Sequence, residues 1–443
     1  MNEEKALYYD VTQLVHWSGR ITGIPRVMEE LAIRYQKAYP DAVFVSWVKE
    51  IREFCEVDLN ASLARRGHGV VYVHEGASTQ SSLATRVAKH EVAAPPAPSL
   101  AKRAVKKGLR VTARYNPRVA RAVERRALAV HMAQWKRAEM KRGDSLFIPW
   151  GEWWDENFIV KLEHLHETGV YLLQVLHDMS PIVVPQFSNS GNATETFPIY
   201  CRRIFPICDL ILSVSENSRR DALAWLKAND LPVPKIEVFR LGDDIEIAKS
   251  EKPDVSEVKG GLKKDGFLLM VGTIELKKNH QLLYYVYKLA KARGIELPPI
   301  VLAGRYGWMT EATVELMTKD PEVKDKFIFM IGKSDEELSW LYDHCLFTVL
   351  PSLYEGWGIP IAESVARGVP CLCSNTSSMT EIAEGYVAHF NPTSTDECLE
   401  GIQTWLDSKK LMVARQKVTQ YKQYSWDDSF RQVDVYVKET LHG

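Results

Sequence analysis

Two glutamates lie close together in a stretch whose other residues suit the binding of a phosphate-bearing ligand. Residues 351–363 read PSLYEGWGIPIAE, so Glu355 and Glu363 have seven residues between them. The glycines between them let a ligand approach the backbone closely, and Pro360 suits the first turn of a helix. The free N–H groups and positive dipole of that helix end favour an anion. The stretch predicts a loop that binds a phosphate group flanked by hydroxyls; the simpler alternative is a capped helix with two exposed glutamates.

Further polar residues follow apolar runs elsewhere in the chain. Lys277 and Lys278 come shortly after one such run, and His177 and Asp178 directly follow another. The carboxyl ends of parallel strands form the ligand-binding edge of an open α/β sheet. We therefore expect His177 to point into the space between two domains, although a histidine at a strand end is often only structural.

Two loops near the N-terminal half contain candidate residues as well. Gly23 follows the first apolar run, and Arg26 lies at the start of a helix that we predict from about residue 25 to 39. Residues 150–154 read WGEWW and follow another apolar run. The ring of Trp153 is suited to stacking on a sugar ring, and burial in the core is the alternative.

The elements that would position these residues are short, nearly continuous apolar runs alternating with helical patterns. Such runs are typical of parallel strands that are buried on both faces. The predicted strands are 6–9, 43–47, 145–149, 170–176, 210–214, 267–271, 300–303, 327–331, 347–350 and 370–374. A segment rich in charge, Gly and Pro, 249–265, separates the two series. The pattern predicts two doubly wound α/β domains with a ligand-binding cleft between them.

Length and composition set limits on the class of protein. The 443 residues favour two domains, and the net charge is −1. No apolar stretch approaches the roughly 20 residues that span a bilayer, and the first residues do not resemble a signal peptide. The seven cysteines contain no Cys-x-x-Cys pair, so we expect buried thiols in a reducing compartment.

One segment, 102–142, is strongly basic. It holds 14 Lys and Arg residues against two acidic ones, a net charge of +12, and follows a Pro- and Ala-rich spacer at 93–98. Its apolar residues allow amphipathic helices, which would suit an anionic membrane surface. A solvated, charged insertion is the alternative. We expect no nucleic-acid partner, because no stacking aromatics or binding motif accompany the charges.

The motif at 351–370, together with 374–381, resembles the donor-binding signature of the retaining GT-B glycosyltransferases of family GT4. Other stretches are similar to that family in the same order: 22–26, 213–218, 241–244, 271–279, 302–305 and 424–427. The resemblance is strong over about 170–435 and weaker before it. It implies a GT-B fold with three parts: an acceptor-binding domain at 1–250 with a basic helical insertion at about 95–142, a nucleotide-sugar-binding domain at 263–424, and a helix at 425–443 that crosses back to the first domain.

The resemblance also implies roles for individual residues, which divide into three groups. The catalytic group is Glu355, Lys278, His177 and Arg305. The donor-binding group is Gly23, Thr273, Lys277, Gly356, Trp357, Gly358, Ile359, Glu363 and Gly332. The acceptor group is Arg26, Asp178 and Trp153. Many relatives have arginine where this chain has Thr273, so Arg305 or Lys277 would supply the second charge on the diphosphate.

The implied activity is hexosyl transfer with retention, most simply of mannose from GDP-mannose. The acceptor would be a glycan or lipid-linked glycan of bacterial surface polysaccharide, such as O-antigen or capsule, assembled in the cytoplasm or on the inner face of the membrane. The chain lacks Asp-x-Asp, so we expect no metal and no cofactor. Alternatives are a UDP-glucose or deoxysugar (rhamnose) transferase, a phosphorylase- or epimerase-type enzyme of the same fold, and a non-catalytic, membrane-associated carbohydrate-binding protein.

Overall fold

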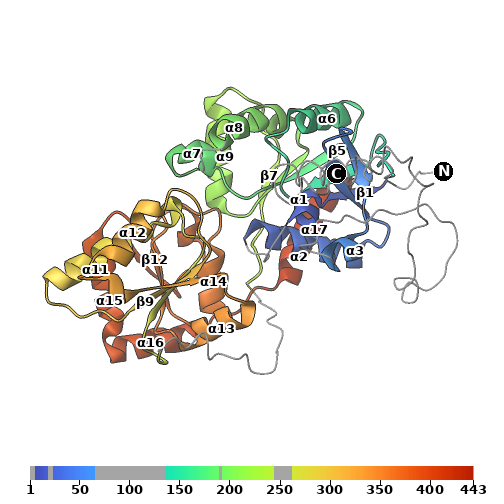
Figure 1. The fold of residues 1–443 in the computed structure, drawn as a ribbon. Helices are drawn as coiled ribbons and strands as arrows, with labels where there is room; N and C mark the ends of the chain where they lie inside the picture. Colours follow the sequence, from blue (N-terminus) through green and yellow to red (C-terminus); the bar gives the residue numbers. More distant parts are fainter. Residues whose placement is uncertain (1–4, 18–22, 65–135, 189–191, 244–261, 443) are drawn as a thin grey trace, which may run out of the picture.

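The computed structural model describes residues 5–17, 23–64, 136–188, 192–243 and 262–442 (Figure 1). They form two α/β domains, each built on one open sheet, and a final helix. Most of the segment 249–265 and most of the basic segment 102–142 lie outside the described residues. Among the described residues, no helix is long and apolar enough to cross a membrane.

The N-terminal sheet has the strand order β3-β2-β1-β4-β5-β6-β7, and only β3 is antiparallel to its neighbour. Its strands are β1 (Leu7–Asp10), β2 (Val43–Val48), β3 (Glu53–Glu56), β4 (Ser145–Ile148), β5 (Tyr171–Leu176), β6 (Leu210–Ser213) and β7 (Ile236–Val238). Its helices are α1 (Thr12–His16), α2 (Ile24–Ala38), α3 (Leu59–Ala64), α6 (Glu156–Glu167), α7 (Ser180–Val183), α8 (Ala193–Ile204) and α9 (Glu216–Ala228). The strand order reverses between β1 and β4, where such sheets bind ligands.

The C-terminal sheet is entirely parallel, with the order β10-β9-β8-β11-β12-β13. Its strands are β8 (Leu268–Val271), β9 (Ile300–Gly304), β10 (Phe327–Ile331), β11 (Thr348–Leu350), β12 (Cys371–Ser374) and β13 (Ala388–Phe390). Its helices are α11 (His280–Ala292), α12 (Glu311–Lys319), α13 (Asp335–His344), α14 (Ile359–Ala366), α15 (Thr395–Leu406) and α16 (Ser408–Val418). The order reverses between β8 and β11, again the ligand-binding position for this topology.

The last helix, α17 (Trp426–His442), packs against α2 and β6 of the N-terminal domain, and Figure 1 shows it in red beside the blue N-terminal elements. Arg34 pairs with Asp427 at 2.6 Å, and Ser429 donates to the carbonyl of Arg240 at 2.6 Å. Trp426 is buried against Gly242, where any side chain would collide with the indole. These contacts hold the end of the chain on the first domain.

All ten predicted strands are confirmed, but the three short strands β3, β7 and β13 were missed. The prediction of a helix up to residue 142 is wrong at its described end. Arg137 forms an antiparallel bridge with Cys55, and the N–H of Ala138 donates to the carbonyl of Phe54. Extended backbone is favoured there because it pairs with β3, the edge strand of the sheet.

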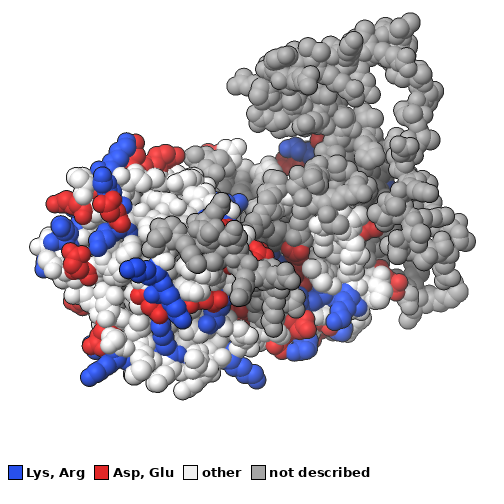
Figure 2. Space-filling model, turned by 60° about the horizontal axis from the view of Figure 1, so that its bottom comes forward, with Lys and Arg blue, Asp and Glu red and all other residues white. Residues whose placement is uncertain are grey.

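All seven cysteines are buried and unpaired, as expected from the sequence. The face in Figure 2 shows basic and acidic side chains interspersed over the described surface of the C-terminal domain. Ion pairs of this domain include Arg293 with Asp396 and Lys319 with Glu315.

Candidate functional site

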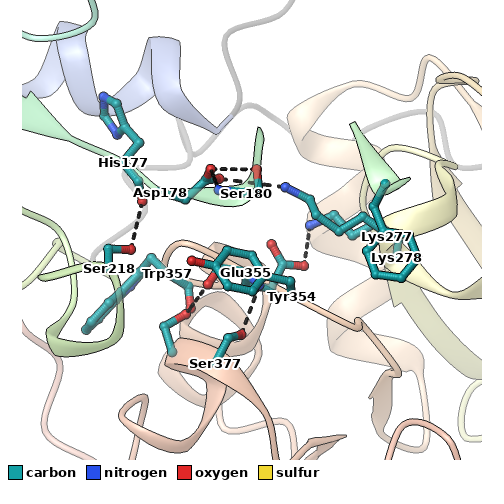
Figure 3. Close-up of polar contacts among 12 residues, drawn as sticks. His177, Asp178, Ser180, Ser218, Lys277, Lys278, Tyr354, Glu355, Trp357 and Ser377 are labelled. Atoms are coloured by element: carbon teal, nitrogen blue, oxygen red, sulfur yellow. Dashed lines mark hydrogen bonds and ion pairs between the residues drawn. The ribbon is translucent and has the colours of Figure 1, made fainter. Parts of the chain in front are cut away.

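The candidate site lies where the C-terminal sheet reverses its order, opposite the end of β5 (Figure 3). The 3-10 helix η4 (Leu276–Lys278) follows β8, and the loop with Glu355 follows β11. Asn279, in the left-handed conformation, donates from its side chain to the carbonyls of Pro351 and Pro392. This side chain therefore ties η4 to the Glu355 loop.

Lys278 and Glu355 form a close ion pair in the site. Lys278 Nζ lies 2.6 Å from Glu355 Oε1, and the two side chains are only 12% and 9% exposed. Burial alone would raise the pKa of Glu355, but the charges of Lys278 and Lys277 lower it below its ordinary value. The carboxylate is therefore ionised at neutral pH.

A second pair joins the two domains. Lys277 Nζ lies 3.7 Å from Asp178 Oδ2, across the interdomain boundary. Burial acts against both charges, yet the pKa of Lys277 is raised by Asp178, and that of Asp178 is lowered by Lys277 and by hydrogen bonds from Ser180. The structure thus brings both lysines of η4 together with carboxylates, one from each domain.

The loop after Glu355 is held by two serines that the sequence analysis did not single out. Ser377 Oγ accepts from the Glu355 N–H at 2.9 Å, and Ser378 Oγ donates to the carbonyls of Glu355 and Trp357. Trp357 itself is buried in the core. The signal for these serines is a hydroxyl pair shortly after a strand end, here β12.

The glycines of this loop meet two different demands. A Cβ on Gly356 would lie 2.1 Å from the carbonyl oxygen of His177, so the two domains touch at this residue. Gly358 has φ 105° and immediately precedes Ile359, the first residue of α14. Both positions require glycine, one for space and the other for a backbone conformation that side chains disfavour.

Glu363 lies inside α14 and has both oxygens occupied. Tyr342 donates its hydroxyl to Oε2 at 3.0 Å, and Arg26 Nη1 lies 3.0 Å from Oε1. Arg26 belongs to the N-terminal domain, so this pair also bridges the domains. The arginine expected on the acceptor side thus contacts the glutamate expected on the donor side.

The ring of His177 does not point into the space between the domains, contrary to the expectation. Its Nε2 lies 2.7 Å from the carbonyl oxygen of Pro149, and Figure 3 shows it directed away from the two lysines. Burial lowers the pKa of His177 to about 4, so the ring is neutral and its N–H needs an acceptor inside the domain. The backbone carbonyl faces the other domain instead, where it meets Gly356. It also accepts from Ser218 of its own domain at 3.3 Å.

Three other predicted residues make contacts with different partners. Arg305 is exposed, with its guanidinium 5.5 Å from the centre of the Trp17 ring in the other domain. Thr273 packs at the glycine turn after β9, where its methyl group would meet a Cβ on Gly307. Gly332 donates to the Gly304 carbonyl at the end of the edge strand β10.

Gly23 and Trp153 belong to the N-terminal domain. Gly23 precedes α2 with φ 61°. The ring of Trp153 packs edge-on against Phe197 and Trp154, at 5.6 and 4.8 Å between centroids. These contacts favour the alternative, packing among neighbouring aromatics, and stacking on a sugar stays a prediction.

Two buried carboxyl groups in the N-terminal domain were missed. Asp10 ends β1 and Glu152 follows β4, so both lie at the reversal point of that sheet. Burial raises the pKa of Asp10 to about 6 and that of Glu152 to about 7, despite hydrogen bonds from Thr12 and Gln13 respectively. The available signal was a carboxylate directly at the end of the first predicted strand.

The arrangement can stabilise negative charge that develops between the domains. Two buried ammonium groups converge at the end of β8, and the described residues contain no group of three His, Cys, Asp or Glu side chains placed to hold a metal ion. A third carboxyl group, Glu275, is buried beside them, and burial raises its pKa. The geometry suits a ligand with an anionic group at the lysines and hydroxyls at Glu355 and Glu363.

A family comparison decides what kind of domain presents this geometry. The model of the glycosyl transferases group 1 family matches residues 252–423, which include η4, the Glu355 loop and α14. Residues 252–423 are thus similar to a glycosyl transferases group 1 domain, and we call this region the group 1 domain. The group 1 domain covers the donor half of the site implied by the resemblance to family GT4.

Curated relatives are similar over about half of the chain. The serotype-specific mannosyltransferase WbdA of Escherichia coli is 23% identical over 256 residues, 56% of this chain and 31% of that protein. The O-antigen chain mannosyltransferase B of Escherichia coli is 31% identical over 229 residues, 49% of this chain and 58% of that protein. The chain thus spans less than two thirds of the length of these relatives.

Solved structures match the whole two-domain arrangement. Anabaena HepE, in complex with UDP and glucose, has a TM-score of 0.59 at 15% identity, covering 98% of this chain and 99% of that one. Sucrose-phosphate synthase from Thermosynechococcus elongatus has a TM-score of 0.61 at 13% identity with the same coverage. At these identities the likeness shows the fold, which is GT-B, with the group 1 domain as its second half.

Proposed function

We propose that this chain is a retaining glycosyltransferase that moves mannose from GDP-mannose to a glycan or lipid-linked glycan of bacterial surface polysaccharide. The observation that carries the proposal is the buried Lys278–Glu355 pair at the strand-order reversal of a group 1 domain. The names of the relatives, both mannosyltransferases, support mannose as the sugar.

The proposed mechanism is electrostatic. The diphosphate of the donor would lie at Lys278 and at the N-terminus of α14, with Lys277 or Arg305 as the second cation. Charge builds up on the leaving diphosphate as the glycosidic bond breaks, and fixed cations stabilise that charge more than the ground state. The departing phosphate takes the proton of the acceptor hydroxyl on the same face of the sugar, so no covalent nucleophile and no metal ion are needed.

The donor must displace two contacts seen in the structure. Arg26 occupies Glu363, where the ribose hydroxyls would bind, and Asp178 holds Lys277. Both contacts connect the domains, so donor binding exchanges interdomain ion pairs for ligand contacts. We further propose that Asp10 and Glu152 contact acceptor hydroxyls, because they lie at the reversal point of the opposite sheet.

The remaining proposals concern location. We propose that the chain works on the cytoplasmic side of the membrane, with the basic segment 102–142 on an anionic lipid surface. Its net charge of +12 supports this proposal.

Thermal shifts with GDP-mannose, UDP-glucose and dTDP-rhamnose, each with and without EDTA, test the proposal. A ligand at 100 times its Kd stabilises the folded state by about 2.7 kcal/mol. We expect the largest shift with GDP-mannose, no effect of EDTA, and slow release of mannose without acceptor. A larger shift with UDP-glucose would change the donor, and binding without any turnover would favour a non-catalytic protein.

A further inference from the structure

A carboxylate of the group 1 domain caps a helix of the other domain. Glu381 Oε2 accepts from the N–H of Glu216 at 2.8 Å, and Oε1 accepts from the N–H of Asn217 at 2.7 Å. These are the first two residues of α9, and the next N–H, of Ser218, is taken by the side chain of Ser215. The first two N–H groups of α9 therefore have this carboxylate as their acceptor only when the two domains are in contact.

The N-terminal half of α9 holds a second residue of the group 1 domain. Tyr354 donates its hydroxyl to Asp221 Oδ2 at 2.6 Å, and Asn217 Nδ2 donates to that oxygen at 2.9 Å. Tyr354 is buried and directly precedes Glu355. If the domains separated, the Tyr354 hydroxyl and the Asp221 carboxylate would both be exposed to water.

The two contacts lie on either side of the Glu355 loop. Tyr354, the residue before Glu355, is held by α9. Ser377 and Ser378 bind the N–H and the carbonyl of Glu355. These serines belong to the 3-10 helix η6 (Ser377–Thr380), and Glu381 is the next residue. The short segment from η6 to Glu381 thus contacts the Glu355 loop at one end and α9 at the other. The helix η6 also packs against α9.

We propose that Glu381 and the first turn of α9 form a closure latch that positions Glu355 only when the domains meet. A carboxylate at a helix N-terminus is favoured by the dipole and by charge-assisted hydrogen bonds. Water replaces those bonds when the domains separate, so the latch is reversible. The catalytic part of this inference depends on the proposed glycosyl transfer: an aligned Glu355 in a closed site excludes water and limits hydrolysis of the donor.

The direct test measures closure in the protein without any donor. All native cysteines are buried, so dyes can be attached at Glu167→Cys and Lys291→Cys, two exposed positions in different domains. Single-molecule energy transfer then gives the ratio of closed to open molecules. We expect Glu381→Gln to lower this ratio by about tenfold and Glu381→Asp to recover part of it. Glu384→Gln, an exposed carboxylate three residues later, is the matched control and should behave as wild type.

Kinetics provide the second readout. Glu381→Gln should lower kcat for transfer and raise the share of donor lost to hydrolysis, while the Kd for GDP stays within twofold of wild type. A purely structural role would instead lower Tm without changing that share. A wild-type ratio of closed to open molecules in Glu381→Gln, or an equal change in Glu384→Gln, overturns the latch. If wild type turns over no nucleotide sugar, the proposed function fails, and the energy-transfer result still decides the latch.

Discussion

Replacing Lys278 by methionine removes the charge that lies 2.6 Å from Glu355 while keeping most of the apolar length of the side chain. Loss of one preorganised group that stabilises transition-state charge typically lowers kcat by 10² to 10³, or about 3–4 kcal/mol. Both side chains are about nine-tenths buried, so the unpaired Glu355 should also cost about 3 kcal/mol of folding free energy. Lys277 remains nearby, which places the stability effect at the lower end of the range for broken buried pairs.

The two effects can be separated with a double variant. Lys278→Met with Glu355→Gln has no unpaired buried charge, so most of the lost stability should return while transfer stays lost. Urea unfolding and initial rates with GDP-mannose measure the two quantities. If Lys278→Met keeps kcat within threefold of wild type, Lys278 does not stabilise the leaving group. If the double variant is no more stable than the single one, the destabilisation does not come from Glu355.

The pH dependence gives a further check of the same reasoning. In wild type the pKa of Glu355 is lowered, so its contribution to stability is present above the unfolded-state pKa and is lost as pH falls through the folded-state value. Without Lys278, burial should raise this pKa, and the penalty should then be largest at high pH. We therefore expect the stability gap between wild type and Lys278→Met to narrow from pH 7.5 to pH 5.5. A gap that widens on acidification would refute the assignment.

Three other predictions follow from contacts in the structure. Gly356→Ala places a Cβ 2.1 Å from the His177 carbonyl oxygen. This overpacking between the domains should lower the transfer rate by at least about tenfold. Small-angle scattering should show a larger radius of gyration, and an unchanged radius would contradict the clash. Arg26→Ala frees Glu363, so the Kd for GDP measured by calorimetry should fall by up to about fivefold, which corresponds to the free energy of a weak ion pair. A larger Kd than that of wild type would mean that Arg26 helps to bind the nucleotide. Deleting 102–135 should abolish salt-sensitive pelleting with vesicles containing phosphatidylglycerol, and equal pelleting would remove the membrane proposal for this segment.

Local sequence was sufficient for most of the architecture. Short, nearly continuous runs of apolar residues identify the parallel strands that are buried on both faces. Such a run is a local pattern of a few residues, so it can be recognised without knowing the tertiary structure. The short edge strands β3, β7 and β13 have no such signal, since only one neighbour and one hydrogen-bonded side define them. The glycines and the proline before α14 likewise show the Glu355 loop from local backbone demands alone.

The sequence by itself determined the two-sheet fold, the order of the elements, and the presence of Lys278 and Glu355 at neighbouring strand ends. Only the tertiary structure decided which partner each charged group takes. Arg26 pairs with Glu363 and Glu381 caps α9, contacts between residues 337 and 165 positions apart in the chain. The orientation of His177 was also decided by tertiary structure, because burial keeps its ring neutral and an acceptor was available at Pro149. Such pairings depend on how two independently formed sheets meet, and no local pattern of residues encodes that contact.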